Sequence, residues 1–122
     1  MTDTERKELV RSYLGKTVTI GIDRPIGYVH QKKDGTTLVY PINYGYIPGV
    51  LGGDGEELDV YLLGVDTPVE EYTCRIVGIV YRRNDVEDKL IAAPQGVNVS
   101  VEQMARAVHF QEQYYDSYVE TE

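Results

Sequence analysis

Four carboxylates lie close together in the middle of the chain, directly before an apolar run. They are Asp54, Glu56, Glu57 and Asp59. Packed carboxylates repel one another unless they are protonated or bridged by cations. Hard oxygen ligands on a short loop suit Mg²⁺, which usually keeps several waters and shares them with phosphate. The residue types therefore indicate a Mg²⁺ site, whereas composition alone favours a solvated acidic turn, because charge runs on turns usually lie at the surface.

The stretch before these carboxylates is aromatic and rich in turn-forming residues. Residues 40–53 contain two prolines and four glycines, with tyrosine at 40, 44 and 46. This composition predicts an ordered loop with a short strand at 44–47. If the strand period already holds in the acidic cluster, Glu57 and Asp59 share one face, and the glycines beside Asp54 allow it to converge with Asp59.

The elements that position this stretch are mostly predicted strands. Thr2 followed by Glu5 suits a capping box at the start of a helix over 2–14. Thr17 to Ile22 alternates between apolar and polar residues, which is the period of a half-buried strand. Further strands are predicted at 26–30, 36–39, 58–65, 72–81 and 89–93, with a hairpin turn at 32–35.

The last part of the chain predicts one more helix. Ser100 followed by Gln103 fits a second capping box, and residues 101 to about 118 have helical composition. Short strands with Gly-rich turns, followed by a helix, indicate a mainly β (α+β) fold. We expect residues 1–122 to form a single domain, a small OB-like β-barrel with the C-terminal helix packed on it and a short N-terminal helix.

Composition narrows the classes of partner. Twenty acidic and twelve basic residues give a net charge of −8, which disfavours nucleic acid and anionic membranes, although a local cationic patch could still bind a small anion. No apolar run approaches a membrane span, and the N-terminus lacks a signal-peptide core. The single cysteine, Cys74, is expected to be an inert core residue. These features predict a cytoplasmic location, and Arg82 and Arg83 are expected on a solvated turn.

Two motifs in order resemble a known family. The segment YPINYGYIPG, followed by DGEELDV at 54–60, is similar to the signature of the soluble family I inorganic pyrophosphatases, whose acidic box usually reads DGDPxDV. The similarity continues through RIVGIVYRRNDVEDKLIAAP at 75–94 and reaches the predicted last helix at His109, Phe110 and Tyr114. It covers residues 17–115, and the chain is shorter than typical members of the family.

The resemblance implies a metal site and a catalytic residue. Asp54 and Asp59 match the family's paired metal-binding aspartates, and Glu87 takes the place of a third aspartate. Asp85 or Asn84 stands where another metal-binding aspartate is expected. Glu56 takes the place of the aspartate that resembles a general base for the attacking water. Glu56 and Glu87 are each one methylene longer than the aspartates they replace.

The resemblance also implies phosphate ligands. Lys89 matches a phosphate-binding lysine, Tyr44 and Tyr114 match tyrosines whose hydroxyls bind phosphate, and Lys32 or Lys33 replaces an expected arginine. Three further positions depart from the family. They are Gly21 in place of a metal-associated glutamate, and Gly27 and Tyr115 in place of phosphate-binding lysines.

The implied activity is Mg²⁺-dependent hydrolysis of inorganic pyrophosphate to two phosphates by a metal-activated water. Because the transition state of phosphoryl transfer spreads charge over its oxygens, the changed cations leave two alternatives open. One is a hydrolase of the same fold that acts on another phosphoanhydride, such as a nucleotide or polyphosphate. The other is a catalytically weak module that binds phosphate or nucleotide. Members of the family commonly form homo-oligomers, which the resemblance leaves open for this chain.

Overall fold

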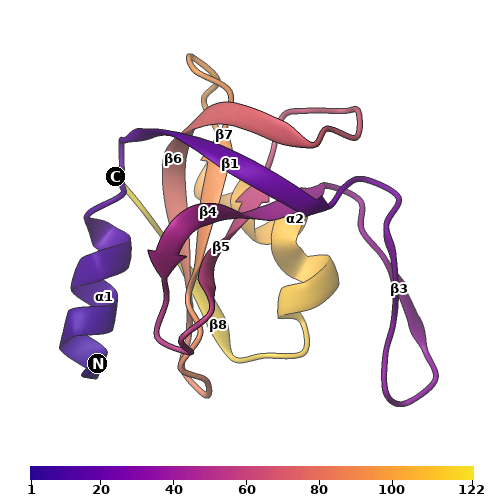
Figure 1. Ribbon diagram of the computed structural model, residues 1–122, viewed down its shortest axis with the longest axis horizontal. Helices are drawn as coiled ribbons and strands as arrows, with labels where there is room; N and C mark the ends of the chain where they lie inside the picture. Colours follow the sequence, from indigo (N-terminus) through magenta and orange to yellow (C-terminus); the bar gives the residue numbers. More distant parts are fainter.

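Five strands close into a β-barrel in the order β1, β4, β5, β7, β6 and back to β1 (Figure 1). The computed structural model describes residues 1–122. The elements are α1 Asp3–Arg11, β1 Thr17–Arg24, β2 Val29–Gln31, β3 Thr37–Val39, β4 Asn43–Leu51, β5 Glu57–Leu62, β6 Glu71–Arg82, β7 Lys89–Ala93, α2 Val101–Glu112 and β8 Ser117–Thr121. The strands β5 and β7 pair in parallel, and the other barrel pairs are antiparallel. The prediction of a mainly β, OB-like barrel with two helices is confirmed.

The long strand β6 pairs with two different strands along one of its edges. Its residues 71–75 pair with β1 and close the barrel, whereas residues 78–82 pair with β8. Its other edge pairs with β7. A strand of 12 residues is long enough to hold both partners in succession along one edge. The C-terminal end of β6 therefore extends beyond the closed part of the barrel, and Arg82 lies there.

Alternation along the strands separates two faces, which determines where the site forms. On β5, Val60 and Leu62 belong to the core inside the barrel, while Tyr61 belongs to a second core cluster on the outside. Met104 and Val108 of α2 pack in this second cluster, so α2 covers the outer face. Because side chains alternate at a period of two, Asp59 and Lys89 lie on this outer face as well.

Both helices begin where the capping boxes predict, but both end earlier than predicted, and α1 ends at Arg11 rather than at residue 14. Thr2 and Ser100 are the N-caps, each with its reciprocal partner three residues later. The predicted helix up to about Tyr118 is wrong, because α2 ends at Glu112 and residues 117–121 form β8. The sequence of β8, SYVET, is rich in residues that favour strands, and pairing with the free edge of β6 stabilises the extended chain.

Three other predicted strands have clearly different bounds, and one of them, β5, ends at Leu62 rather than at residue 65. The strand β2 begins at Val29 rather than Ile26, because residues 25–28 form a turn in which Tyr28 N donates to Pro25 O. It pairs only with β3, in a hairpin that extends away from the barrel (Figure 1). The strand β4 is longer than the predicted 44–47, because the register with β5 shifts between Tyr46 and Leu51 and accommodates Pro48.

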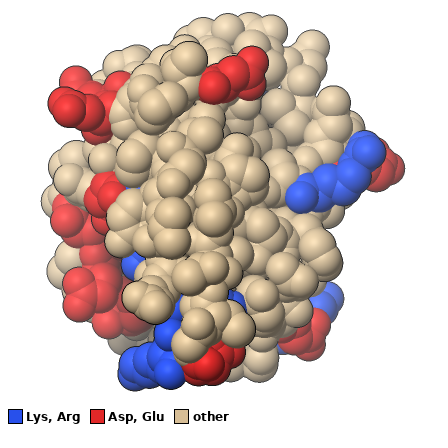
Figure 2. All heavy atoms as spheres, turned by 90° about the vertical axis from the view of Figure 1, so that its right-hand side faces the viewer, with Lys and Arg blue, Asp and Glu red and all other residues tan.

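Three further features concern the helices, the cysteine and the surface charge. None of the helices has the length and apolar character needed to cross a membrane. Cys74 is buried as predicted, and burial raises the pKa of its thiol to about 11. On the face drawn in Figure 2, Lys and Arg form small separate groups and acidic side chains gather along the left edge. This face presents no continuous cationic stripe.

Gly45 belongs to the first sequence motif, and β1 and β4 lie too close together at this position to leave room for a side chain. A Cβ on Gly45 would lie 1.8 Å from the carbonyl oxygen of Gly21. We therefore expect Gly45→Ala to lower the free energy of unfolding by about 1–3 kcal/mol, measured by urea denaturation, because the two strands must separate. Gly52→Ala is the control, since its Cβ would meet no atom closer than 3.6 Å. Equal stability of the two variants would contradict this account of the strand contact.

Candidate active site

The ammonium group of Lys89 is the point where the two sequence motifs meet. Its Nζ donates hydrogen bonds to Tyr44 Oη at 2.6 Å, Glu87 Oε1 at 2.6 Å and Asp59 Oδ2 at 2.9 Å. Tyr44 comes from β4, Asp59 from β5, and Glu87 from the loop before β7. Of the residues that the sequence predicts for the site, these four are brought into direct contact.

Burial makes the arrangement around Lys89 specific. The residue is 2% exposed, and a buried cation is costly unless it is paired and hydrogen-bonded. Asp59 and Glu87 supply the opposite charges and are themselves partly exposed. Burial, and then the nearby carboxylate of Asp59, raise the pKa of Tyr44 well above its usual value, so its hydroxyl stays neutral. The cluster therefore holds a fixed cation beneath two carboxylates that water can reach.

A second buried cation, Arg82, lies beside the first. Its Nε and Nη2 donate to the carboxylate of Glu112 at 3.0 and 2.7 Å, and its Nη1 lies 3.5 Å from both Asp85 and Glu87. The guanidinium also lies 3.6 Å from the centre of the Tyr115 ring. The expected solvated position of Arg82 is wrong, because the end of β6 places it under the loop that carries Glu87.

The neighbouring Arg83 is exposed, as predicted, and forms a surface ion pair with Asp116. The same loop separates the two candidates for the additional metal-binding position. Asn84 Oδ1 accepts a hydrogen bond from Asp116 N at 3.2 Å, away from Glu87, whereas Asp85 shares Arg82 with Glu87. The geometry therefore favours Asp85 over Asn84.

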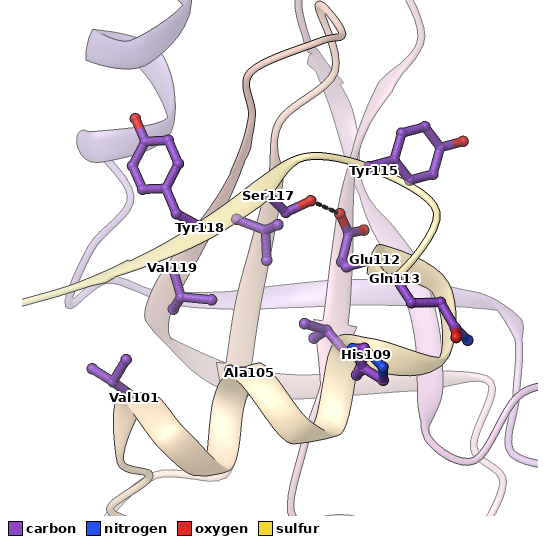
Figure 3. A pocket seen from close by; sticks show the side chains of 11 residues that line it. Val101, Ala105, His109, Glu112, Gln113, Tyr115, Ser117, Tyr118 and Val119 are labelled. Carbon is purple, nitrogen blue, oxygen red and sulfur yellow. Dashed lines mark hydrogen bonds between the residues drawn. The ribbon is translucent and has the colours of Figure 1, made fainter.

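The carboxylate of Glu112 joins α2 and β8 to Arg82. In addition to Arg82 it accepts hydrogen bonds from Tyr61 Oη and Ser117 Oγ, each at 2.6 Å. Figure 3 shows Glu112 and Ser117 facing one another across the cleft between α2 and β8. Burial acts to raise the pKa of Glu112, but the hydrogen bonds from Arg82, Ser117 and Tyr61 outweigh it and leave the pKa below its ordinary value.

The acidic turn forms the exposed side of the site. Glu56, Glu57 and Asp59 line one shallow pocket of about 360 Å³ together with Asp23 and Tyr46. This agrees with the prediction that Glu57 and Asp59 share a face. The same strand period would place Glu56 on the opposite face, which is wrong, because β5 begins only at Glu57 and Glu56 belongs to the turn. Asp54 is used locally, since its Oδ1 accepts a hydrogen bond from Glu56 N at 3.0 Å. The turn is thus both solvated and adjacent to Asp59.

The donor chemistry fits Mg²⁺, although the carboxylates are not closely grouped. No cluster of three or more His, Cys, Asp or Glu side chains has the spacing of a metal cage. Asp59 and Glu87 meet at Lys89, and Asp54 shares no such contact with them. Mg²⁺ is commonly held by one or two carboxylates, with waters and substrate phosphate completing its shell, so this set of oxygens suits it.

Comparisons with known proteins agree with the motifs. The model of the inorganic pyrophosphatase family matches residues 15–120. The chain belongs to the inorganic pyrophosphatase family. It is 30% identical to the inorganic pyrophosphatase of Rickettsia felis over 117 residues, covering 75% of this chain and 68% of the relative. It is 44% identical to that of Saccharolobus solfataricus over 64 residues, covering 49% of this chain and 37% of the relative.

Solved structures of inorganic pyrophosphatases have the same fold. The structure from Ehrlichia chaffeensis aligns with a TM-score of 0.64 at 22% identity, covering 88% of this chain and 87% of that one. The structure from Helicobacter pylori aligns with a TM-score of 0.59 at 22% identity, covering 90% and 84%. The predicted resemblance to the family is confirmed, and with it membership of a family of hydrolases.

The other predicted phosphate ligands of this chain, Lys32 and Tyr114, line a second, smaller pocket, called the hollow below. The hollow has a volume of about 160 Å³, and Lys32 Nζ lies 3.2 Å from the centre of the Tyr114 ring. Tyr114 is 58% exposed. The hollow lies between the β2–β3 hairpin and the end of α2, and neither residue hydrogen-bonds to Lys89 or its partners.

Sequence reasoning missed Arg24, which also lines this hollow. Its Nη1 donates to Tyr40 Oη at 2.6 Å, and that hydroxyl donates to Gln111 at 2.7 Å. The guanidinium lies 5.5 to 5.9 Å from the ring centres of Tyr28, Tyr40 and Tyr44. Arg24 is the last residue of β1 and lies 16 positions before Tyr40, so no local pattern in the sequence links it to these tyrosines. No local sequence pattern marked Glu112 or Tyr61 as part of the site.

Proposed function

We propose that this protein hydrolyses inorganic pyrophosphate to two phosphates in a Mg²⁺-dependent reaction. The observation that carries the proposal is the convergence of Tyr44, Asp59 and Glu87 on the buried ammonium of Lys89. Family membership supports the same reaction, since the relatives are named inorganic pyrophosphatases. A single domain, a cytoplasmic location and a homo-oligomer stay predictions.

In this proposal two sets of donors bind the substrate. Lys89 would bind one phosphate once Glu87 or Asp59 turns from its ammonium to Mg²⁺ and frees an N–H donor, and the Tyr44 hydroxyl would bind the same phosphate. The fixed positions of these two donors then stabilise charge that develops on the phosphate oxygens. Lys32, Tyr114 and Arg24 line the neighbouring hollow and bind the other phosphate. Since a diphosphate carries several negative charges, the cations on both sides also offset repulsion from the acidic turn.

The metal-binding side of the proposal uses the carboxylates. Asp59 and Glu87 would hold Mg²⁺, with Asp85 and Asp54 as further ligands. When bound, the ion neutralises phosphate oxygens and lowers the pKa of water. Glu56 is exposed beside Asp59 and would take a proton from the attacking water. The water oxygen bonds to one phosphorus, the bridging P–O bond breaks, and the second phosphate leaves with the bridging oxygen.

Another phosphoanhydride is the second candidate substrate, and one observation favours it. Gly27 stands where the resemblance implies a phosphate-binding lysine, and a Cβ there would have no atom within 4 Å. Gly27 therefore supplies neither a cation nor a steric limit at this turn, which weakens the preference for pyrophosphate. Phosphate release from tripolyphosphate or a nucleoside triphosphate, exceeding release from pyrophosphate, would favour this candidate.

The proposal is tested by phosphate release from pyrophosphate and Mg²⁺ with the purified protein. Asp59→Asn is expected to lower the rate by about 10²-fold or more, because it removes a charge beside both the metal and Lys89. Asp66→Asn, an exposed change outside the site, is the control. Release no greater than background from the unmodified protein would exclude pyrophosphate hydrolysis. Binding of phosphate without turnover would instead indicate a binding module.

A further inference from the structure

The helix α1 lies outside the residues that match the family, yet one of its side chains reaches the site. The match begins at residue 15, whereas α1 spans Asp3–Arg11. The buried residues of α1 are Arg6 and Val10, so this short helix turns a charged side chain inward. A buried arginine needs a specific partner.

The buried partner of Arg6 is Asp88, which lies between Glu87 and Lys89 in the sequence, whereas its second carboxylate contact, Asp3, is exposed. Arg6 Nε donates to Asp88 Oδ2 at 2.8 Å, and the two side chains are 10% and 1% exposed. The other carboxylate oxygen of Asp88 is buried without a hydrogen-bond partner. Arg6 is therefore the one side chain that pairs with this carboxylate, and it fixes the loop at the residue between Glu87 and Lys89, which pair with each other.

The same arginine packs against the acidic turn. A Cβ on Gly53 would lie 2.6 Å from Arg6 Cδ and 2.6 Å from the carbonyl oxygen of Val86. The backbone of Gly53 thus lies directly on the aliphatic part of Arg6 and on the loop before β7. Gly53 precedes Asp54, so a single side chain contacts both acidic segments.

We propose that Arg6 is a positioning residue that holds two segments together, the turn over 52–57 and the loop over 83–88. The inference rests on the proposed function, because these segments carry Asp54, Glu56, Asp85 and Glu87. Neither segment belongs to a helix, and only Glu57 lies in a strand, so their relative position depends on side-chain contacts such as these. Arg6 acts on the metal-binding carboxylates through the backbone of both segments and touches no substrate.

Arg6→Met tests this role, since it keeps the aliphatic part of the side chain and removes the charge. Amide hydrogen exchange in 52–57 and 83–88 is expected to become at least about 10-fold faster in the protein without added metal. The Mg²⁺ concentration for half-maximal hydrolysis is expected to rise by about 10-fold, with kcat at saturating Mg²⁺ changed much less. Arg6→Lys, which retains the charge, is expected to restore most of the metal affinity.

Arg11→Met is the matched control, because Arg11 attaches the same helix to Glu120 by an exposed ion pair. It should leave the exchange of both segments and the Mg²⁺ requirement unchanged. Equal effects of the two methionine variants would overturn the proposal, because they would show only that α1 had loosened. Unchanged exchange in folded Arg6→Met would overturn it too.

Asp88→Asn keeps the inference testable if Arg6→Met does not fold. It keeps the side-chain shape, leaves Arg6 packed on Gly53, and should shift exchange and Mg²⁺ requirement in the same direction by a smaller factor. No shift in either quantity would overturn the proposal. If the unmodified protein releases no phosphate from pyrophosphate, the proposed function fails, while the exchange comparison still decides the role of Arg6.

Discussion

Lys89→Met is expected to lower kcat for pyrophosphate hydrolysis by at least about 10²-fold, the loss typical of removing one fixed donor to a charged transition state. The physical reason is that Lys89 supplies a buried, fixed cation in contact with Tyr44, Asp59 and Glu87. Methionine fills similar volume without charge, so Asp59 and Glu87 lose the cation between them. Steady-state phosphate release at saturating Mg²⁺ measures the effect.

The matched control for Lys89 is Lys16→Met, an exposed residue directly before β1. It removes the same charge from the protein at a site without a carboxylate partner within ion-pair distance. We expect its kcat to stay within about 3-fold of the unmodified protein, as is usual for a surface change away from such features. A folded Lys89→Met variant with a rate in the same range would show that the Lys89 cluster is structural.

Glu112→Gln is expected to lower the free energy of unfolding by about 3 kcal/mol or more, because it leaves the buried guanidinium of Arg82 without its carboxylate partner. The amide can still hydrogen-bond to Tyr61 and Ser117, so the loss reports mainly on charge. The melting temperature should fall by roughly 10 °C, measured by circular dichroism. Activity should fall as well, since Arg82 contacts Glu87.

The neighbouring pair Arg83–Asp116 is the control for Glu112, because its side chains are 55% and 60% exposed. Asp116→Asn should cost less than about 1 kcal/mol, as exposed ion pairs generally do. If the two variants melted at the same temperature, the Arg82–Glu112 pair would contribute no more than a surface contact.

The carboxylate of Glu112 also makes the free energy of unfolding depend on pH in the acid range. The pKa of Glu112 in the folded protein is lower than its ordinary value. A group with a depressed folded pKa stabilises the protein above its unfolded pKa and loses that contribution as pH falls through the folded pKa. The stability difference between the unmodified protein and Glu112→Gln should therefore be complete near pH 7 and should shrink once the pH falls below about 4.5, the range of an ordinary glutamate.

Local patterns predicted much of the fold. The strands β1, β6 and β7 and both helix starts agree with the alternation and the capping boxes, because these signals arise from residues close together in the sequence. The end of α2 was not predictable in this way. Residues 113–118 have helical composition, but the free edge of β6 offers backbone hydrogen bonds that a longer helix would leave unused.

The sequence by itself determined the family, the barrel and a set of candidate site residues, because the two motifs carry those residues in the order typical of the family. Only the tertiary structure showed the partners of Arg82, Glu112 and Arg6. Arg82 pairs with Glu112 across 30 positions, and Arg6 pairs with Asp88 across 82. Such partners have no local pattern, since a buried ion pair depends on which side chains the fold brings together and excludes from water. For the acidic turn, the sequence alone showed which carboxylates it contains. Only the fold showed that Asp59 contacts Lys89 while Asp54 does not.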